Sequence, residues 1–176
     1  MNDLTFIHVP KTAGISITKW FLNNFKNSAI IKPIVHPSTE TIENLTSESF
    51  AVVRNPWDRI VSLWSFQKKY QKLDVPFDTF VRNLESYKFA EESWFTFDQP
   101  QKAWIPNGVT YLLKFETLED DFKVIQEKLG CHEPLMKANT TEHDDYHTYY
   151  KVETWNIVAE LFKDDIETFG YKDDTL

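Results

Sequence analysis

His8-Val-Pro-Lys-Thr-Ala-Gly-Ile-Ser16 is a short basic turn that joins an apolar run to a helix. Residues 4–9 are apolar and rich in β-branched and aromatic types, which is typical of a buried strand. After the turn, apolar residues recur at helical spacing (Ile17, Phe21, Phe25), which predicts the buried face of a helix. A strand that enters a helix in this way leaves backbone N–H groups at the helix N-terminus, where an anion is favoured.

Lys11 adds a full positive charge beside these N–H groups, so the turn predicts a phosphate-binding loop. It is not a Walker A loop, because in G-x-x-x-x-G-K-[ST] the lysine follows the second glycine, whereas Lys11 precedes the small residues. Taken alone, the stretch is equally compatible with an ordinary strand-to-helix turn that carries a surface lysine. A second motif favours the phosphate-binding loop.

The second motif follows another buried strand, predicted at residues 50–53, and begins with Arg54. Asn55 is a good N-cap and Pro56 a good first helical residue, so a helix is expected to start there. Arg54 then lies at the carboxyl end of a strand, and Ser62 lies about two turns along the next helix. Open α/β sheets bind nucleotides at the carboxyl ends of their parallel strands. Both motifs fall at such ends.

The rest of the chain continues the alternation of strands and helices. A short strand is expected at residues 29–35, with Pro33 keeping it at an edge or ending it. A helix at 77–84, a strand at 109–115, a helix from Thr117 to Gly130 and a last helix at about 153–167 follow. This order predicts an α/β fold. Because no repeat or linker divides the chain, a single domain over residues 1–176 is expected.

Composition narrows the cellular context. Cys131 is the only cysteine, which excludes an internal disulfide framework and fits a reducing compartment. The chain has no run of about 18 apolar residues and no basic N-terminal region followed by an apolar one. A soluble, cytoplasmic protein without membrane insertion is therefore expected.

Charge is unevenly distributed along the chain. The net charge of −8 argues against nucleic acid as a partner. Residues 1–90 nevertheless carry 11 Lys or Arg against 8 Asp or Glu, whereas residues 91–176 carry 8 against 19. The anion site should lie in the first half.

A metal site is not expected. Four potential ligands stand in the second half of the chain, but no pair of them has the spacing of a compact structural zinc site. They are Cys131, His132, His143 and His147.

Together, the stretches 8–16 and 50–62 resemble the sulfotransferases that use 3′-phosphoadenosine 5′-phosphosulfate (PAPS), especially the carbohydrate and heparan-sulfate type. Weaker similarity continues through residues 99–101, 115–116, Asn139 and 169–171. The resemblance implies a P-loop-NTPase-like, three-layer α/β/α fold with a central, mainly parallel sheet.

The resemblance also implies a donor site. Lys11 and the backbone and hydroxyl groups of the residues after it would hold the 5′-phosphosulfate, and Arg54 and Ser62 would hold the 3′-phosphate. Relatives usually have threonine where this chain has Ile15, so one hydroxyl donor is missing. The predicted donor-binding set is Lys11, Thr12, Ala13, Gly14, Ile15, Ser16, Arg54 and Ser62.

The implied reaction is an in-line transfer of the sulfuryl group from PAPS to a hydroxyl or amine of a small-molecule or glycan acceptor, leaving 3′,5′-adenosine bisphosphate (PAP), without a metal. Positioning and charge stabilisation should supply most of the acceleration, and Lys11 is the catalytic cation. His36 is the first candidate for the general base, because it follows the second strand and imidazole titrates near neutral pH. Glu40 is the second candidate, and His36 as a surface residue that caps a turn is the alternative interpretation.

Two other functions fit parts of the pattern. A catalytically weak nucleotide- or glycan-binding module would keep the fold, and Ile15 and the short chain favour it. A small P-loop kinase is disfavoured by the missing Walker A spacing and by the lack of an evident carboxylate for Mg²⁺.

Overall fold

The computed structural model describes residues 4–25, 31–35, 48–70, 72–84, 99–136 and 143–172, with residues 31–35 described by their backbone. The contacts divide the chain into two compact units, Met1–Arg54 with Trp104–Thr140 and Asn55–Ala103 with Thr141–Leu176. The single domain over residues 1–176 stays a prediction. His36, Glu40 and Asn139 lie outside the described residues.

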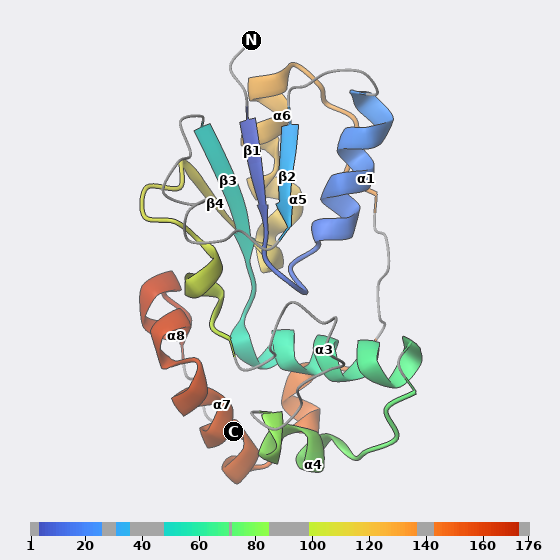
Figure 1. Cartoon of the computed structure of the whole chain (residues 1–176), viewed down its shortest axis with the longest axis vertical. Helices are drawn as coiled ribbons and strands as arrows, with labels where there is room; N and C mark the ends of the chain where they lie inside the picture. The colour runs from blue at the N-terminus through green and yellow to red at the C-terminus, as the bar shows by residue number, and fades with distance from the viewer. Residues whose placement is uncertain are drawn as a thin grey trace. The chain divides into compact units, whose positions relative to one another are not determined.

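The first unit holds the sheet, and the second is helical (Figure 1). The elements of the first unit are β1 (Leu4–His8), α1 (Gly14–Asn24), β2 (Ile31–Val35), β3 (Glu48–Val53), β4 (Tyr111–Lys114), η3 (Phe115–Thr117), α5 (Leu118–Asp121) and α6 (Lys123–Leu129). The elements of the second are α3 (Pro56–Tyr70), α4 (Phe77–Arg82), η4 (Tyr146–Tyr149), α7 (Val152–Leu161) and α8 (Lys163–Phe169). The short helix η2 (Gln101–Trp104) spans the boundary.

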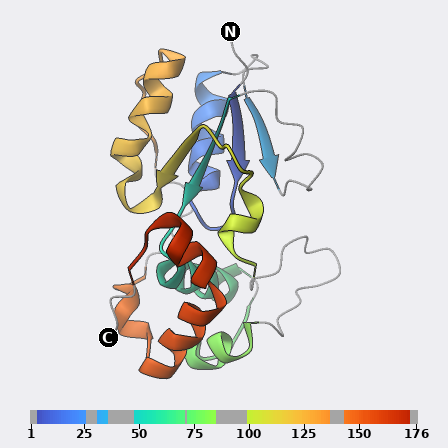
Figure 2. The ribbon, with the colours of Figure 1, turned by 90° about the vertical axis from the view of Figure 1, so that its left-hand side faces the viewer.

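The described sheet has four parallel strands in the order β2-β1-β3-β4 (Figure 2). This confirms the predicted α/β class with a mainly parallel sheet. Pro33 of β2 pairs with Phe6 of β1, and β2 is an edge strand of these four. The edge position agrees with the prediction, because proline has no N–H to give to a further strand.

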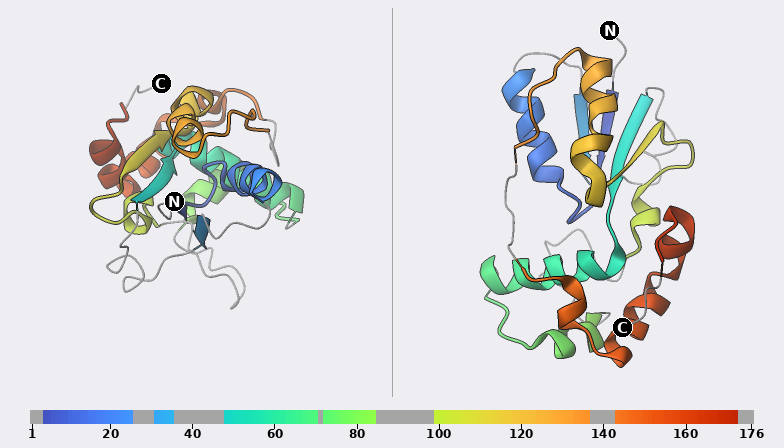
Figure 3. Two further views of the ribbon diagram at one scale, coloured as in Figure 1. Left: turned by 90° about the horizontal axis from the view of Figure 1, so that it is seen from above. Right: turned by 180° about the vertical axis from the view of Figure 1, so that it is seen from behind.

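Aromatic side chains hold the first unit together. Phe6 and Phe50 stack on neighbouring strands, with ring centroids 4.8 Å apart. Trp20 of α1 meets Phe122 edge-to-face at 5.0 Å, so α1 and the α5–α6 pair pack in one cluster. Seen from behind, α1 and α6 both lie in front of the strands (Figure 3). One layer of helices therefore covers the sheet face on which Phe6 and Phe50 lie.

The second unit packs around two tryptophans. Trp57 of α3 stacks on Trp155 of α7 at 4.5 Å, and the Trp57 indole N–H donates to the Trp155 carbonyl. The Asn55 side chain accepts the N–H groups of Trp57 and Asp58, which confirms the predicted N-cap of α3. The helix that follows Arg54 therefore begins where the sequence predicts.

Two predicted helices are each divided in two. The predicted cap residue, Thr117, makes no side-chain cap bond. The Asp121 carboxylate accepts a hydrogen bond from the backbone N–H of Lys114 instead. Phe122 separates α5 from α6. In the last helix, Phe162 separates α7 from α8. Phe122 keeps helical angles (φ −69°, ψ −16°), and its N–H donates to the Leu118 carbonyl while its carbonyl accepts from the Gln126 N–H, so the interruption there is slight. Phe162 has φ −111° and ψ 25°, outside the helical region, so the chain bends between α7 and α8.

Candidate anion-binding site

The candidate site lies at the carboxyl edge of the sheet. From β1 the chain crosses to β2 on one side and then returns to β3 on the other, so the strand order reverses between β1 and β3. At such a reversal, the loops after the two strands diverge and leave a crevice for a ligand. Residues 9–13 follow β1, and Arg54 follows β3. The structure thus places both predicted motifs at the same edge of the first unit.

The loop after β1 has an unusual backbone. Lys11 and Ala13 have φ angles of 70° and 68°, in the left-handed region that side chains other than glycine rarely adopt. Left-handed residues within such a turn direct successive N–H groups toward a common point, where an anion binds. The Thr12 hydroxyl donates to the Val9 carbonyl at 2.9 Å and is buried, so it braces the turn. Because this hydroxyl is used within the turn, the predicted contact of Thr12 with the donor would be made by its backbone N–H.

Arg54 is held beside this loop. One of its terminal nitrogens donates to the Lys11 carbonyl at 3.2 Å, and its guanidinium carbon lies 4.0 Å from the centroid of the Phe115 ring. The side chain is only 7% exposed. Arg54 therefore fixes the carbonyl of a left-handed residue and brings a permanent positive charge to the loop.

The electrostatics of Lys11 match an anion site. Burial, together with repulsion from Arg54, lowers the Lys11 pKa to about 8. A multiply charged anion between the two cations would reverse both effects, since it attracts the ammonium form. The arrangement of Lys11 and Arg54 thus favours a ligand that carries more than one negative charge.

The remaining loop residues begin α1. Gly14 is its first residue, and Ser16 is buried within its first turn. Ile15 is 40% exposed, so an apolar side chain meets solvent at the position where the family resemblance leads us to expect a hydroxyl. These positions remain predicted donor contacts.

The structure does not bring Ser62 or the two base candidates into this site. Ser62 is buried on α3, in the second unit, and His36 and Glu40 lie outside the described residues. His36 directly follows Val35, which ends β2 and pairs with His8 at the same sheet edge. The base role of His36 or Glu40 stays a prediction from the sequence.

Phe115 is the residue that sequence reasoning missed. It comes directly after β4, as Arg54 comes directly after β3, and Val53 pairs with Lys114 in the register of the two strands. The strand-end rule that singled out Arg54 therefore applies to Phe115 as well. The sequence placed Phe115 only at the end of the predicted strand 109–115 and in the weaker family similarity.

Among the residues that the structure describes, no group of three or more His, Cys, Asp or Glu side chains is arranged to hold a metal ion. Among the same residues, no helix is both long and apolar enough to cross a membrane.

The chain is similar to known proteins in sequence and in structure. A model described as the sulfotransferase family matches residues 1–172. An uncharacterized protein of Archaeoglobus fulgidus is 28% identical over 99 residues, which cover 55% of this chain and 80% of that protein. The crystal structure of mouse sulfotransferase SULT7A1 complexed with PAP is similar with a TM-score of 0.59 and 14% identity, covering 94% of this chain and 84% of that one. The structural match agrees with the predicted P-loop-like fold.

Proposed function

Because this chain belongs to the sulfotransferase family, we propose that it transfers the sulfuryl group of PAPS to a hydroxyl or amine of a carbohydrate-like acceptor. PAP is what remains of PAPS once the sulfuryl group has left. The PAP complex of the mouse sulfotransferase supports PAPS as the donor substrate.

The pairing of Lys11 with Arg54 is the observation that carries this proposal. Two cations and a turn with left-handed residues converge where a parallel sheet reverses its strand order. Burial and the Arg54 charge lower the pKa of Lys11, and an anion beside its ammonium would raise that pKa again. A nucleotide with phosphates at both its 3′ and 5′ positions supplies such an anion.

Each group then has a distinct task. The Lys11 ammonium meets the negative charge that develops on the oxygen between phosphorus and sulfur. The backbone N–H groups of residues 12–16 hold the 5′-phosphate at the start of α1. Arg54, whose guanidinium is a fork of N–H donors, is the proposed partner of the 3′-phosphate.

In the transfer, the bond between sulfur and the 5′-phosphate oxygen breaks as the acceptor oxygen or nitrogen bonds to sulfur. The electron pair of the broken bond stays on PAP. The acceptor proton passes to a general base, for which His36 and then Glu40 are the candidates. His36 is supported by its position in the chain, one residue beyond the strand end that pairs with His8.

The transfer itself is tested by incubating the protein with PAPS and following PAP release by chromatography. A panel of oligosaccharides, amino sugars and simple phenols serves as acceptors. We expect PAP to accumulate with a sugar acceptor and to fall to background in the Lys11→Ala variant. Equal release by parent and variant would contradict the assigned role of Lys11.

Ile15 favours a second candidate, a nucleotide- or glycan-binding module with weak catalysis. Its exposed methyl groups occupy the position at which relatives usually present a hydroxyl to the donor. Such a module would bind PAP, but it would not convert PAPS to PAP with any acceptor in the panel.

A further inference from the structure

Gly14 is in close contact with the His8 ring. A Cβ atom added to Gly14 would lie 1.8 Å from His8 Nε2 and 1.9 Å from Cδ2, whereas real Cβ contacts essentially never fall below 3.0 Å. The φ angle of Gly14 is not positive, so its backbone conformation is open to any residue. Alanine is the better helix former, but its methyl group would have to displace the His8 imidazole. The constraint on position 14 therefore comes from the His8 ring and not from the Gly14 backbone.

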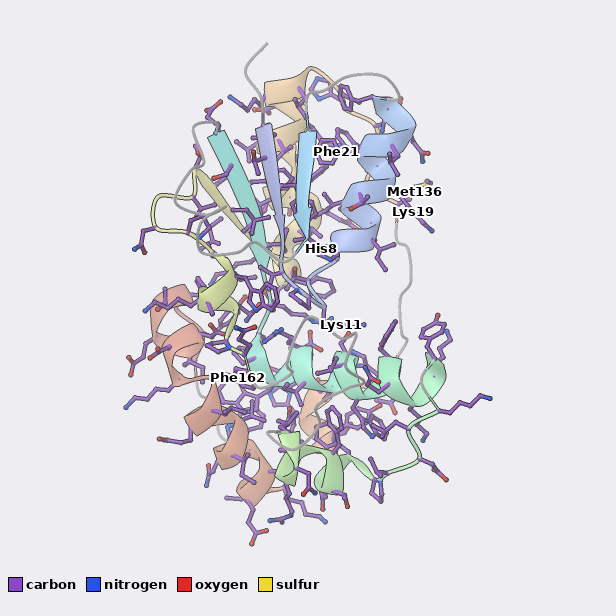
Figure 4. The ribbon with its side chains drawn as sticks, viewed as in Figure 1. His8, Lys11, Lys19, Phe21, Met136 and Phe162 are labelled. Carbon is purple, nitrogen blue, oxygen red and sulfur yellow. The ribbon has the colours of Figure 1, made fainter. Side chains whose placement is uncertain are left out.

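His8 is held on its other side by the sheet. It is the last residue of β1 and pairs with Val35. Its side chain is half-buried and stacks on the Phe6 ring at 5.8 Å with an angle of 17° between the planes. The His8 ring therefore stacks on Phe6 of the packed core and contacts Gly14, the first residue of α1. Figure 4 shows the labelled His8 beside the start of α1.

The contact joins the two ends of the anion-binding loop. His8 precedes residues 9–13, and Gly14 follows them. Within this loop, Lys11 and Ala13 stay in a strained backbone region, which persists only where the surroundings impose it. A clamp between the ends of the loop is such a constraint.

We propose that His8 is a positioning residue for donor binding: its imidazole sets the spacing between the end of β1 and the first turn of α1, and thereby the shape of the loop that receives the 5′-phosphate. This inference rests on the proposed function for the identity of the ligand. His8 acts through Gly14 and the loop, without touching the transferred group.

A double-mutant cycle tests the contact. We measure the PAP dissociation constant and the melting temperature without ligand for the parent, His8→Ala, Gly14→Ala and the double variant. Gly14→Ala alone should weaken PAP binding at least tenfold, because its methyl group displaces the ring. In the His8→Ala background the same methyl group should cost less than threefold, since the ring is gone.

Gly130→Ala provides a control for simple loss of stability. Gly130 has a φ of 63° and no atom within 4 Å of an added Cβ, so the variant strains the end of α6 without touching the loop. It should lower the melting temperature and leave the PAP dissociation constant within twofold of the parent. All affinities are measured well below the lowest melting temperature in the set.

Each outcome decides a separate question. If the parent binds PAP and Gly14→Ala costs equally with and without the His8 ring, the positioning role is overturned and the proposed function stands. If Gly14→Ala does not fold, His8→Ala and the double variant are compared, and a tenfold difference between them overturns it. If the parent does not bind PAP, the proposed function falls, and the loop's role as a PAP cradle falls with it; the melting temperatures still report the ring contact.

Discussion

Lys11 should make donor binding depend on pH. Its pKa is about 8 in the free protein, below the usual 10.5, because of burial and Arg54. Bound PAP raises this pKa again, so binding takes up a proton whenever free Lys11 is neutral. We therefore expect PAP affinity to be highest below pH 8 and to fall toward pH 10, by up to about tenfold per pH unit.

Calorimetry between pH 7 and 10 checks this, since phosphate groups with a second pKa of about 6 stay fully ionised there. The matched control is Lys11→Met, which keeps the length of the side chain and removes the amine. Its PAP affinity should be lower and flat with pH. A parent profile as flat as that of the variant would contradict the assignment.

Ile15 offers a gain-of-function test. Its side chain is 40% exposed, so replacing it with threonine loses little packing and restores the hydroxyl that relatives carry. One added hydrogen bond contributes about 1 kcal/mol, which is roughly fivefold in affinity or rate. We expect Ile15→Thr to release PAP from PAPS about fivefold faster than Ile15→Val, which has the same shape without the hydroxyl. Equal rates for the two variants would show that position 15 does not contact the donor.

Arg54 should distinguish nucleotides by their 3′-phosphate. Arg54→Ala removes the proposed partner of that phosphate and also the bond to the Lys11 carbonyl. Affinity for adenosine 5′-monophosphate should therefore fall somewhat, and affinity for PAP should fall at least tenfold further. Arg82→Ala, which removes an exposed arginine of α4 that pairs with Glu153 of α7, serves as the control. An equal loss for both nucleotides in Arg54→Ala would contradict the 3′-phosphate contact.

Local sequence rules could place the charged residues of the site but not their supports. Lys11 and Arg54 each follow a strand with a clear apolar pattern, so the strand-end rule brings them to one edge. Phe115 and His8 belong to the same edge, yet phenylalanine is most often a core residue and histidine is intermediate between core and surface, so neither type by itself marks a ligand site. Their roles depend on contacts between distant or bulky groups, such as the stacking of Arg54 on Phe115, which spacing does not encode.

Helix ends in this chain follow two different rules. Gly130 ends α6 in the left-handed conformation, as the sequence predicts from its position after Leu129. The breaks at Phe122 and Phe162 carry no local mark, because the apolar spacing runs through both residues. Burial in a core, which the helical spacing also predicts for both rings, does not distinguish an interrupted helix from a continuous one.

Gly130→Ala should cost stability through backbone strain alone. No atom lies within 4 Å of the added methyl group, so the left-handed φ of 63° is the only source of cost. The expected loss is about 1 kcal/mol in the free energy of unfolding. Urea unfolding of parent and variant measures it, and an unchanged midpoint would show that the end of α6 relaxes to another conformation.

The first unit brings the parallel sheet and the cationic loop together. Its parallel strands set every carboxyl end at one edge, so positive groups that are distant in sequence meet there. The alternation of strands and helices predicts this arrangement well, because parallel connections through helices permit few topologies. The division into two compact units was not predicted, since no linker in the sequence marks any of the three boundaries.

The most direct test of the donor site is the thermal stabilisation of the whole chain by PAP compared with ATP and Mg²⁺. A ligand at 100 times its Kd adds about 2.7 kcal/mol of stability. For a chain of this size, that corresponds to a rise in Tm of about 5–10 °C. We predict such a rise with PAP and a much smaller one with ATP and Mg²⁺. No rise with PAP, or a larger rise with ATP and Mg²⁺, would contradict a PAPS site at Lys11 and Arg54.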